Sequence, residues 1–239
     1  MIFNTRPKFY RDRFHEAFAS IGLPILDCPV LTPEPTGVAL PAPDDFDSVI
    51  FTSQIAVAMF PARAEWQLRK AYAVGLGTAD AVRAAGFSDV VCTGADAEDM
   101  EQRLTGEPFQ NALYASAEDV SKDLSEVFPE RIRRLSIYRM VLLADLPAPV
   151  RTTIEDSAEV ILPLFSKRTA VAVAALLRKG RLVSDSPHIC AVGISDGIFA
   201  VEEGPWHCRA VASSPTLDAM VAKTRDLAID IGLISKVVR

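Results

Sequence analysis

Two short segments place hydroxyl side chains where a strand gives way to a helix, an arrangement typical of anion binding. Residues 72–87 read YAVGLGTADAVRAAGF, which predicts a strand ending in a turn at Gly77 and a helix that begins at Thr78. Backbone N–H groups at a helix start are unpaired and lie at the positive end of the helix dipole, so they attract anions. The turn lacks the third glycine of a dinucleotide motif and the lysine of a Walker loop, so it matches neither nucleotide-binding pattern.

The same outline occurs a second time in the chain. Residues 191–204 read AVGISDGIFAVEEG, with Ser195 in the corresponding turn. Upstream of the two turns, the strand ends FTSQ and LFSK carry Ser53 and Ser166 in matching places. Paired segments in the same order indicate an internal repeat, so we predict two similar domains.

Composition narrows the class of protein. The chain has 239 residues, 49% of them hydrophobic, which is enough for two cores of about 100 to 130 residues each. A net charge of −6 without a block of Lys and Arg argues against a nucleic-acid or anionic-membrane surface. Neither a signal-peptide layout nor an apolar run of membrane-spanning length is present, so we expect a cytoplasmic protein.

The four cysteines lie far apart and suggest buried free thiols, and the three histidines form no metal-binding pattern.

Strands and helices are expected to alternate along the chain, which predicts parallel sheets with helices on both faces. Proline-rich passages at 33–45 and 139–156 are expected to be linkers. The C-terminal block is short of strands, and the N-terminal strand, helix and strand can supply them. We therefore predict a discontinuous domain of residues 1–32 and 157–239, with an inserted domain of residues 46–138.

Several segments in one order resemble the uroporphyrinogen-III synthase family over nearly the whole chain. They are TRP near the start, FTSQIAV, VGLGTADAVRAAGF, SIYRMVL with Tyr138, LFSKRTA and VGISD. The resemblance implies two flavodoxin-like α/β domains, joined by a two-stranded ladder, with a cleft between them. It also implies a cofactor-free enzyme that cyclises hydroxymethylbilane to uroporphyrinogen III, with loss of water and inversion of the last pyrrole ring.

The resemblance assigns roles to particular residues. Tyr138 is expected to assist departure of the bilane hydroxyl as water, while helix starts, hydroxyls and cations hold the eight carboxylates of the substrate. The expected substrate-binding residues are Thr5, Arg6, Ser53, Gln54, Gly77, Thr78, Ser166, Lys167, Arg168 and Ser195. Asp196 is expected to turn away from the anion. Expected partners are the substrate, the product and, transiently, the preceding enzyme of the pathway; neither nucleic acid nor a membrane is expected, and we expect a monomer.

Simpler interpretations stay open for these residues. The serines are equally well explained as helix caps, Tyr138 as a core residue and the cations as solvated surface. The segment 114–124 departs from the family, because Ala117, Glu118 and Asp119 stand where relatives often place glycine and arginine, and Lys122 is its only cation.

Other protein classes also share this pattern of elements. A non-enzymatic two-lobed binding or sensor protein would suit the same alternating α/β architecture. A flavodoxin is disfavoured because TRPKF, not a hydroxyl-rich phosphate loop, follows the first strand, and a receiver domain would need acidic residues there.

Overall fold

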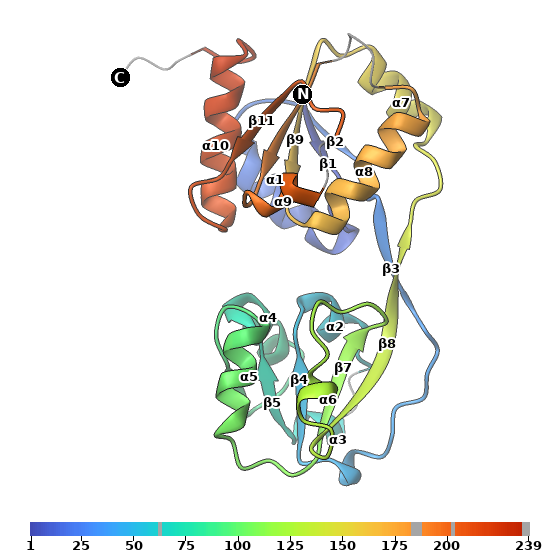
Figure 1. Cartoon of the computed structure of the whole chain (residues 1–239), viewed down its shortest axis with the longest axis vertical. Coiled ribbons are helices and arrows are strands. Elements are labelled where there is room, and N and C mark those ends of the chain that lie inside the picture. The colour runs from blue at the N-terminus through green and yellow to red at the C-terminus, as the bar shows by residue number, and fades with distance from the viewer. Residues whose placement is uncertain (62–63, 183–187, 202–203, 236–239) are drawn as a thin grey trace. The chain divides into compact units, whose positions relative to one another are not determined.

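The chain forms two compact units, each with its own sheet (Figure 1). Unit 1 consists of residues 1–32 and 141–239, and unit 2 of residues 33–140. The structure, a computed structural model, describes residues 1–61, 64–182, 188–201 and 204–235. Residues 202–203 of the second repeat copy therefore lie outside the described residues.

Unit 1 contains a five-stranded sheet in the order β11-β10-β9-β1-β2, in which all neighbouring strands are parallel. The N-terminal strand pairs directly with β9, where Ile2 lies opposite Ile161. Two strands from the start of the chain thus complete a sheet whose other strands come from its second half. The strands are β1 (Ile2–Asn4), β2 (Ile25–Asp27), β9 (Glu159–Leu164), β10 (His188–Gly193) and β11 (Cys208–Val211).

Helices cover both faces of this sheet (Figure 1). Phe14 and Phe18 of α1 are buried and stack on each other, and they share a core cluster with Met220 and Leu227 of α10. Helices α1 and α10 therefore cover one face, while α8 lies on the other (Figure 1). The helices are η1 (Lys8–Tyr10), α1 (Arg11–Ala19), α7 (Ala148–Glu155), α8 (Lys167–Lys179), α9 (Gly197–Val201) and α10 (Leu217–Asp230).

The cysteines depart from the sequence prediction at one pair. Cys190 and Cys208 are register partners on β10 and β11 and form a disulfide, so the expectation of four free thiols is wrong for them. Two strands separated in sequence bring these side chains together, which their spacing does not reveal. Cys28 is free and buried, and Cys92 is free and half-buried.

Unit 2 contains a six-stranded sheet in the order β3-β8-β7-β4-β5-β6. The four pairs from β8 to β6 are parallel. The prediction of two α/β units built on parallel sheets is therefore confirmed. The strands are β3 (Leu31–Pro35), β4 (Ser48–Phe51), β5 (Lys70–Ala73), β6 (Val90–Cys92), β7 (Ala112–Ala117) and β8 (Ile132–Leu142).

Different cores lie on the two faces of this sheet. On one face Met100 and Leu104 of α5 pack against Tyr72 and Tyr114 of the sheet. On the other, Phe51 makes edge contacts with the rings of Phe60 and Phe87. The helices are η2 (Pro43–Asp45), α2 (Gln54–Met59), α3 (Ala64–Gln67), α4 (Gly75–Ala84), α5 (Ala97–Thr105) and α6 (Leu124–Val127).

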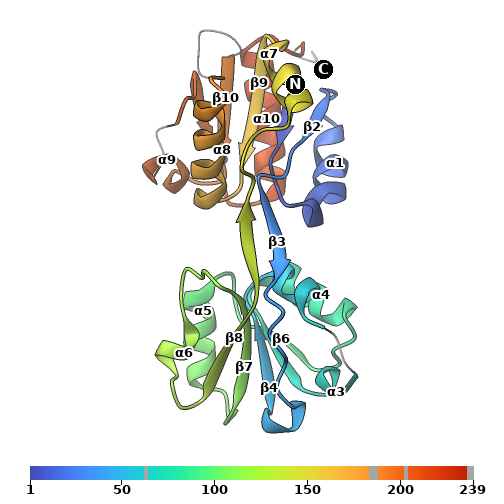
Figure 2. The ribbon, with the colours of Figure 1, turned by 90° about the vertical axis from the view of Figure 1, so that its right-hand side faces the viewer.

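The edge strand β3 pairs with the long strand β8 (Figure 2). Leu143 N–H donates to the Val30 carbonyl at 2.9 Å and Thr36 N–H donates to the Ile137 carbonyl at 3.0 Å. These bonds have the pattern of an antiparallel ladder, as the family resemblance implied. The expected linker regions are partly ordered into elements: 33–45 holds part of β3 and η2, and 139–156 holds the end of β8 and α7.

The first repeat turn differs from its prediction. Strand β5 ends at Ala73 and helix α4 begins at Gly75, so Gly77 and Thr78 lie inside the first turns of the helix. Gly75 has a φ of +73°, a left-handed conformation that favours glycine, and its N–H donates to the Gly94 carbonyl at 2.7 Å. The chain therefore turns two residues earlier than the sequence suggests.

Candidate active site

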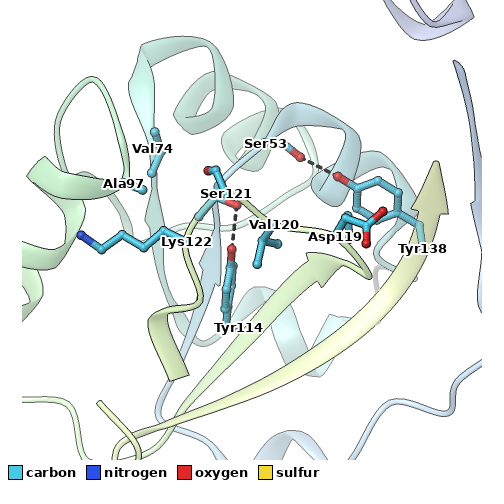
Figure 3. A pocket seen from close by; sticks show the side chains of 11 residues that line it. Ser53, Val74, Ala97, Tyr114, Asp119, Val120, Ser121, Lys122 and Tyr138 are labelled. Atoms are coloured by element: carbon cyan, nitrogen blue, oxygen red, sulfur yellow. Dashed lines mark hydrogen bonds between the residues drawn. The ribbon is translucent and has the colours of Figure 1, made fainter. Parts of the chain in front are cut away.

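A cavity of about 250 Å³ lies in unit 2, at the edge where its parallel strands end (Figure 3). This edge is where open α/β sheets bind ligands. Its walls come from the residues just after β4, from β7 and the middle of β8, from the turn after β5, the start of α5 and the loop after β7. The lining residues are Thr52, Ser53, Val74, Ala97, Tyr114, Ala117, Asp119, Val120, Ser121, Lys122 and Tyr138.

Tyr138 and Ser53 meet in this cavity, where their side chains point toward one another (Figure 3). The Tyr138 hydroxyl lies 3.1 Å from Ser53 Oγ, and either oxygen can be the donor. Ser53 Oγ also accepts the N–H of Ala56 at 3.0 Å and so caps α2. Tyr138 is 5% exposed, which holds its ring firmly while the hydroxyl remains at the cavity wall.

An irregularity between β7 and β8 sets the position of Tyr138. Ser116 lies opposite Ser136, but Ala117 lies opposite Tyr138, so β8 carries one extra residue, Ile137. Such a bulge shifts the alternation of side chains on the strand and is often found beside active sites. Tyr138 therefore lies opposite Ala117, at the start of the loop that lines the cavity.

A second phenol in the cavity escaped the sequence prediction. The Tyr114 hydroxyl lies 3.2 Å from Thr52 Oγ1, and the side chain is 1% exposed. Burial raises the pKa of Tyr114, an effect that the hydrogen bond to Thr52 partly offsets. Nothing in the strand NALYAS separates this tyrosine from a core residue, because Tyr114 lies inside β7 like any buried strand residue.

The cation in this wall is already paired. Lys122 Nζ forms ion pairs with the carboxylates of Glu98 and Glu101. These bonds raise the pKa of Lys122, Glu101 having the larger effect. Asp119 adds a carboxylate to the same wall. The cavity is thus not basic, which agrees with the unusual composition noted for the segment 114–124.

The remaining predicted residues of unit 2 lie apart from the cavity lining. Gln54 is the first residue of α2 and is half-buried. Gly77 is half-buried and Thr78 is buried within α4, as follows from the early start of that helix. None of these three residues lines the cavity.

In unit 1 the predicted residues follow three adjacent strands. Thr5 and Arg6 follow β1, Ser166 follows β9 and Ser195 follows β10, and these parallel strands are neighbours in the sheet. Their carboxyl ends therefore meet at one edge. Thr5 is fully buried, and its Oγ1 has no hydrogen-bond partner in the described part of the chain.

Arg6 is held between two aromatic rings. Its guanidinium carbon lies 4.2 Å from the ring centre of Tyr10 and 4.1 Å from that of Phe165. Burial lowers the pKa of Arg6 to about 10. No carboxylate of the described residues forms an ion pair with it. Its side-chain N–H groups also have no hydrogen-bond partner among those residues, and a partly desolvated guanidinium in this state is well suited to bind a carboxylate.

Helix α8 begins beside this arginine. Ser166 accepts the N–H of Thr169 at 3.1 Å and caps the helix with φ and ψ of −156° and 150°, nearly the −154° and 151° of Ser53. Lys167 and Arg168 follow in its first turn and line a groove of about 440 Å³. The rest of that lining is apolar: Leu31, Leu142, Val171 and Ala172. Ser195 is exposed in the turn before α9, as is Asp196.

Family membership is decided by comparison with known proteins. The model of the family described as uroporphyrinogen-III synthase HemD matches residues 12–222 of this chain. The chain belongs to the uroporphyrinogen-III synthase family. Members of this family are lyases that cyclise hydroxymethylbilane in tetrapyrrole biosynthesis, so the enzyme interpretation is confirmed over the binding or sensor protein.

Solved structures show the same fold. The uroporphyrinogen-III synthetase of Helicobacter pylori is similar with a TM-score of 0.64 and 18% identity, covering 87% of this chain and 93% of that one. A mutant uroporphyrinogen III synthase from Thermus thermophilus gives a TM-score of 0.51 and 13% identity, covering 96% and 98% of the two chains. A comparison with curated proteins finds no significant sequence match.

A metal-binding cluster and a membrane-spanning helix are both lacking in the described residues of this chain. No cluster of three or more His, Cys, Asp or Glu side chains suited to a metal ion occurs among them. Nor does any helix in that part of the chain have the length and apolar character needed to cross a membrane.

Proposed function

We propose that the unit 2 cavity holds the reacting end of hydroxymethylbilane and that Tyr138 assists the loss of water. The observation that carries this proposal is the Tyr138 hydroxyl, fixed 3.1 Å from Ser53 Oγ in the cavity wall. The carbon–oxygen bond of the hydroxymethyl group breaks as the phenol gives its proton to the departing oxygen, leaving water and a cationic azafulvene. A positioned acid of this kind contributes about 10²- to 10⁴-fold. The proton released when the ring closes restores the phenol.

The size of the cavity limits what enters it. Sites for whole drug-sized ligands occupy about 300 to 1,000 Å³, and the cavity has about 250 Å³. It therefore accommodates one end of the tetrapyrrole chain rather than all of it. Positioning that end so that the substituted carbon of the last ring attacks first is the main contribution, because unassisted closure gives the type I isomer.

The edge of unit 1 around Arg6 is the proposed carboxylate-binding region. Arg6 presents N–H groups that no described residue pairs, and the capped start of α8 adds backbone donors beside Lys167 and Arg168. The groove that these two cations border has an apolar lining, which suits pyrrole rings that carry acidic side chains. A chain of net charge −6 thus binds a polyanion through a few local donors.

Two further parts of the proposal concern the cell. We place the enzyme in the cytoplasm, in accordance with its family. We also propose a transient contact with the enzyme that supplies hydroxymethylbilane, because this substrate closes to the wrong isomer when it is left in solution.

The deciding experiment adds purified protein to freshly made hydroxymethylbilane and separates the oxidised porphyrin products by isomer. We expect predominantly type III product at a rate above the blank. Type I product formed at the blank rate would overturn the proposed activity. Substrate affinity measured in parallel separates a protein that binds without turnover from one that does not bind.

A further inference from the structure

Arg134 ties the loop after β7 to strand β8. Its Nε donates to Ser116 Oγ at 2.9 Å, and Nη1 donates to Asp123 Oδ2 at 2.6 Å. Nη2 donates to the carbonyl oxygens of Ala117 and Glu118. One guanidinium, 20% exposed, thus binds four groups across eight residues of chain. Arginine suits this task because its donors diverge in one fixed plane.

The loop held by Arg134 is a wall of the cavity. Five of the eleven lining residues belong to residues 117–122, although Arg134 itself is not among the eleven. In this segment Ala117 is the last residue of β7, and the residues from 118 to 123 form no helix or strand. The position of the wall therefore depends on side-chain bonds more than on secondary structure.

The same loop is also fastened to Tyr138. The Glu118 N–H donates to the Tyr138 carbonyl at 2.9 Å, while the Glu118 carbonyl accepts from Arg134. At the far end of the loop, the Asp123 carboxylate accepts from Arg134 and from the N–H of Ser125. Through the bond from Ser125, Asp123 caps α6. Burial works against the charge of Asp123, but bonds from Ser125 and Arg134 outweigh it and lower its pKa. The ion pair therefore persists at neutral pH.

We propose that Arg134 is a positioning residue for ring closure, which fixes the 117–123 loop against Tyr138 so that the cavity admits the bilane end in one orientation. This inference rests on the proposed function of the cavity. Its specific consequence is isomer choice. When the loop is displaced, bound substrate still loses water but closes without inversion, so type I product forms on the enzyme.

The test compares Arg134→Gln and Arg134→Lys with the wild type and with Arg133→Gln. Arg133 is the matched control, since it is the neighbouring exposed arginine of β8. Products are separated by isomer over a range of enzyme concentrations up to an excess over substrate. We expect Arg134→Gln to lower kcat by about 10- to 100-fold, the scale of a misplaced catalytic wall, with a raised type I fraction that persists at enzyme excess. Arg134→Lys keeps one ion pair and restores part of the type III fraction.

Adding more enzyme distinguishes a displaced loop from a partly unfolded protein. A smaller folded fraction is corrected by adding enzyme, whereas a displaced loop is not. If the Arg134 variants give the same isomer ratio as Arg133→Gln at enzyme excess, the inference is overturned while the proposed function stands. Should Arg134→Gln fail to fold, Asp123→Asn removes the charge but keeps a good capping residue, and it decides the question by the same readout. A wild type that makes only type I product rejects the proposed function itself.

Discussion

Ser53 Oγ joins two elements that are far apart in sequence, because it lies 3.1 Å from the Tyr138 hydroxyl on β8 and 3.0 Å from the Ala56 N–H in α2. One serine oxygen therefore acts as a helix cap and as the partner of the proposed acid. Its two roles can be separated by substitution, since capping affects stability and the phenol contact affects turnover.

Tyr138→Phe removes the hydroxyl and leaves the ring in its buried place. We expect kcat to fall by up to about 10²- to 10⁴-fold, the range for a positioned acid, with little change in the urea midpoint. Tyr72→Phe is the control, because the Tyr72 hydroxyl donates to Glu107 away from the cavity lining. Unchanged kinetics for Tyr138→Phe would remove this residue from the mechanism.

Ser53 and Ser166 allow a matched pair of substitutions. Replacement of either by Ala removes a cap and costs about 1 kcal/mol of unfolding free energy, whereas Gly costs only a few tenths. We expect Ser53→Gly to lower kcat as much as Ser53→Ala, because both lose the oxygen that holds Tyr138. Ser166→Ala and Ser166→Gly are the capping controls for kcat; because the start of α8 is a proposed carboxylate-binding element, any further effect of these two variants is expected in KM.

Urea unfolding and kcat for all four variants check this prediction. If Ser53→Gly turns over like the wild type while Ser53→Ala does not, the serine acts only through its cap.

Periodicity and paired motifs predicted much of the fold. Ser53 and Ser166 occupy equivalent caps because their repeat copies fold alike, and the alternation of strands and helices gave two parallel sheets. The predicted start of α4 was wrong because Gly75 and Gly77 could each make the turn. Of these two, Gly75 is the one that adopts the left-handed conformation.

Much of the candidate site could not be predicted from the sequence. Tyr138 came from the family resemblance, but its contact with Ser53 depends on a bulge that leaves no pattern in SIYRMVL. In the sequence, Arg134 looks like a solvated arginine on a strand. Its role could not be predicted because two of its four acceptors are main-chain carbonyls, which leave no mark in the sequence. Contacts of this kind arise from tertiary packing, which single-sequence periodicity does not record.

The stability of unit 1 is expected to depend on pH through Asp27. It accepts hydrogen bonds from Asn4 at 2.7 Å and Arg11 at 2.9 Å, and lies 2.7 Å from His15 Nε2. Burial alone would raise its pKa, but these three contacts outweigh burial and lower the pKa. A carboxylate with a lowered folded-state pKa stabilises the fold above its unfolded value of about 3.9, and that stabilisation is lost as the pH falls.

The measurement is urea unfolding between pH 3 and 7. We expect Asp27→Asn to destabilise unit 1 near neutral pH and to approach the wild type at the acid end. Asp226→Asn, at an exposed position of α10, is the control. A constant difference between Asp27→Asn and the wild type at every pH contradicts the prediction.

Substitution of Arg6 is expected to weaken substrate binding without slowing the chemical step. We expect Arg6→Gln to raise KM by about 10-fold, the scale of one lost charge-assisted hydrogen-bonded pair of 1.5 kcal/mol or more, with kcat within a few-fold of the wild type. Arg6→Lys should recover little of this loss, because an ammonium lies poorly between the rings of Tyr10 and Phe165 and offers no planar edge.

The control for Arg6 is Arg13→Gln, which removes the same charge from an exposed position of α1. Long-range attraction of a polyanion weakens equally in both variants and disappears at high salt, since exposed charges are screened within about 10 Å at 0.1 M. A direct contact at Arg6 keeps part of its effect at high salt, so KM is measured at two ionic strengths. Equal KM values for the two variants at both salt concentrations would mean that Arg6 contributes only to the general field, and carboxylate binding in unit 1 would then depend on the start of α8.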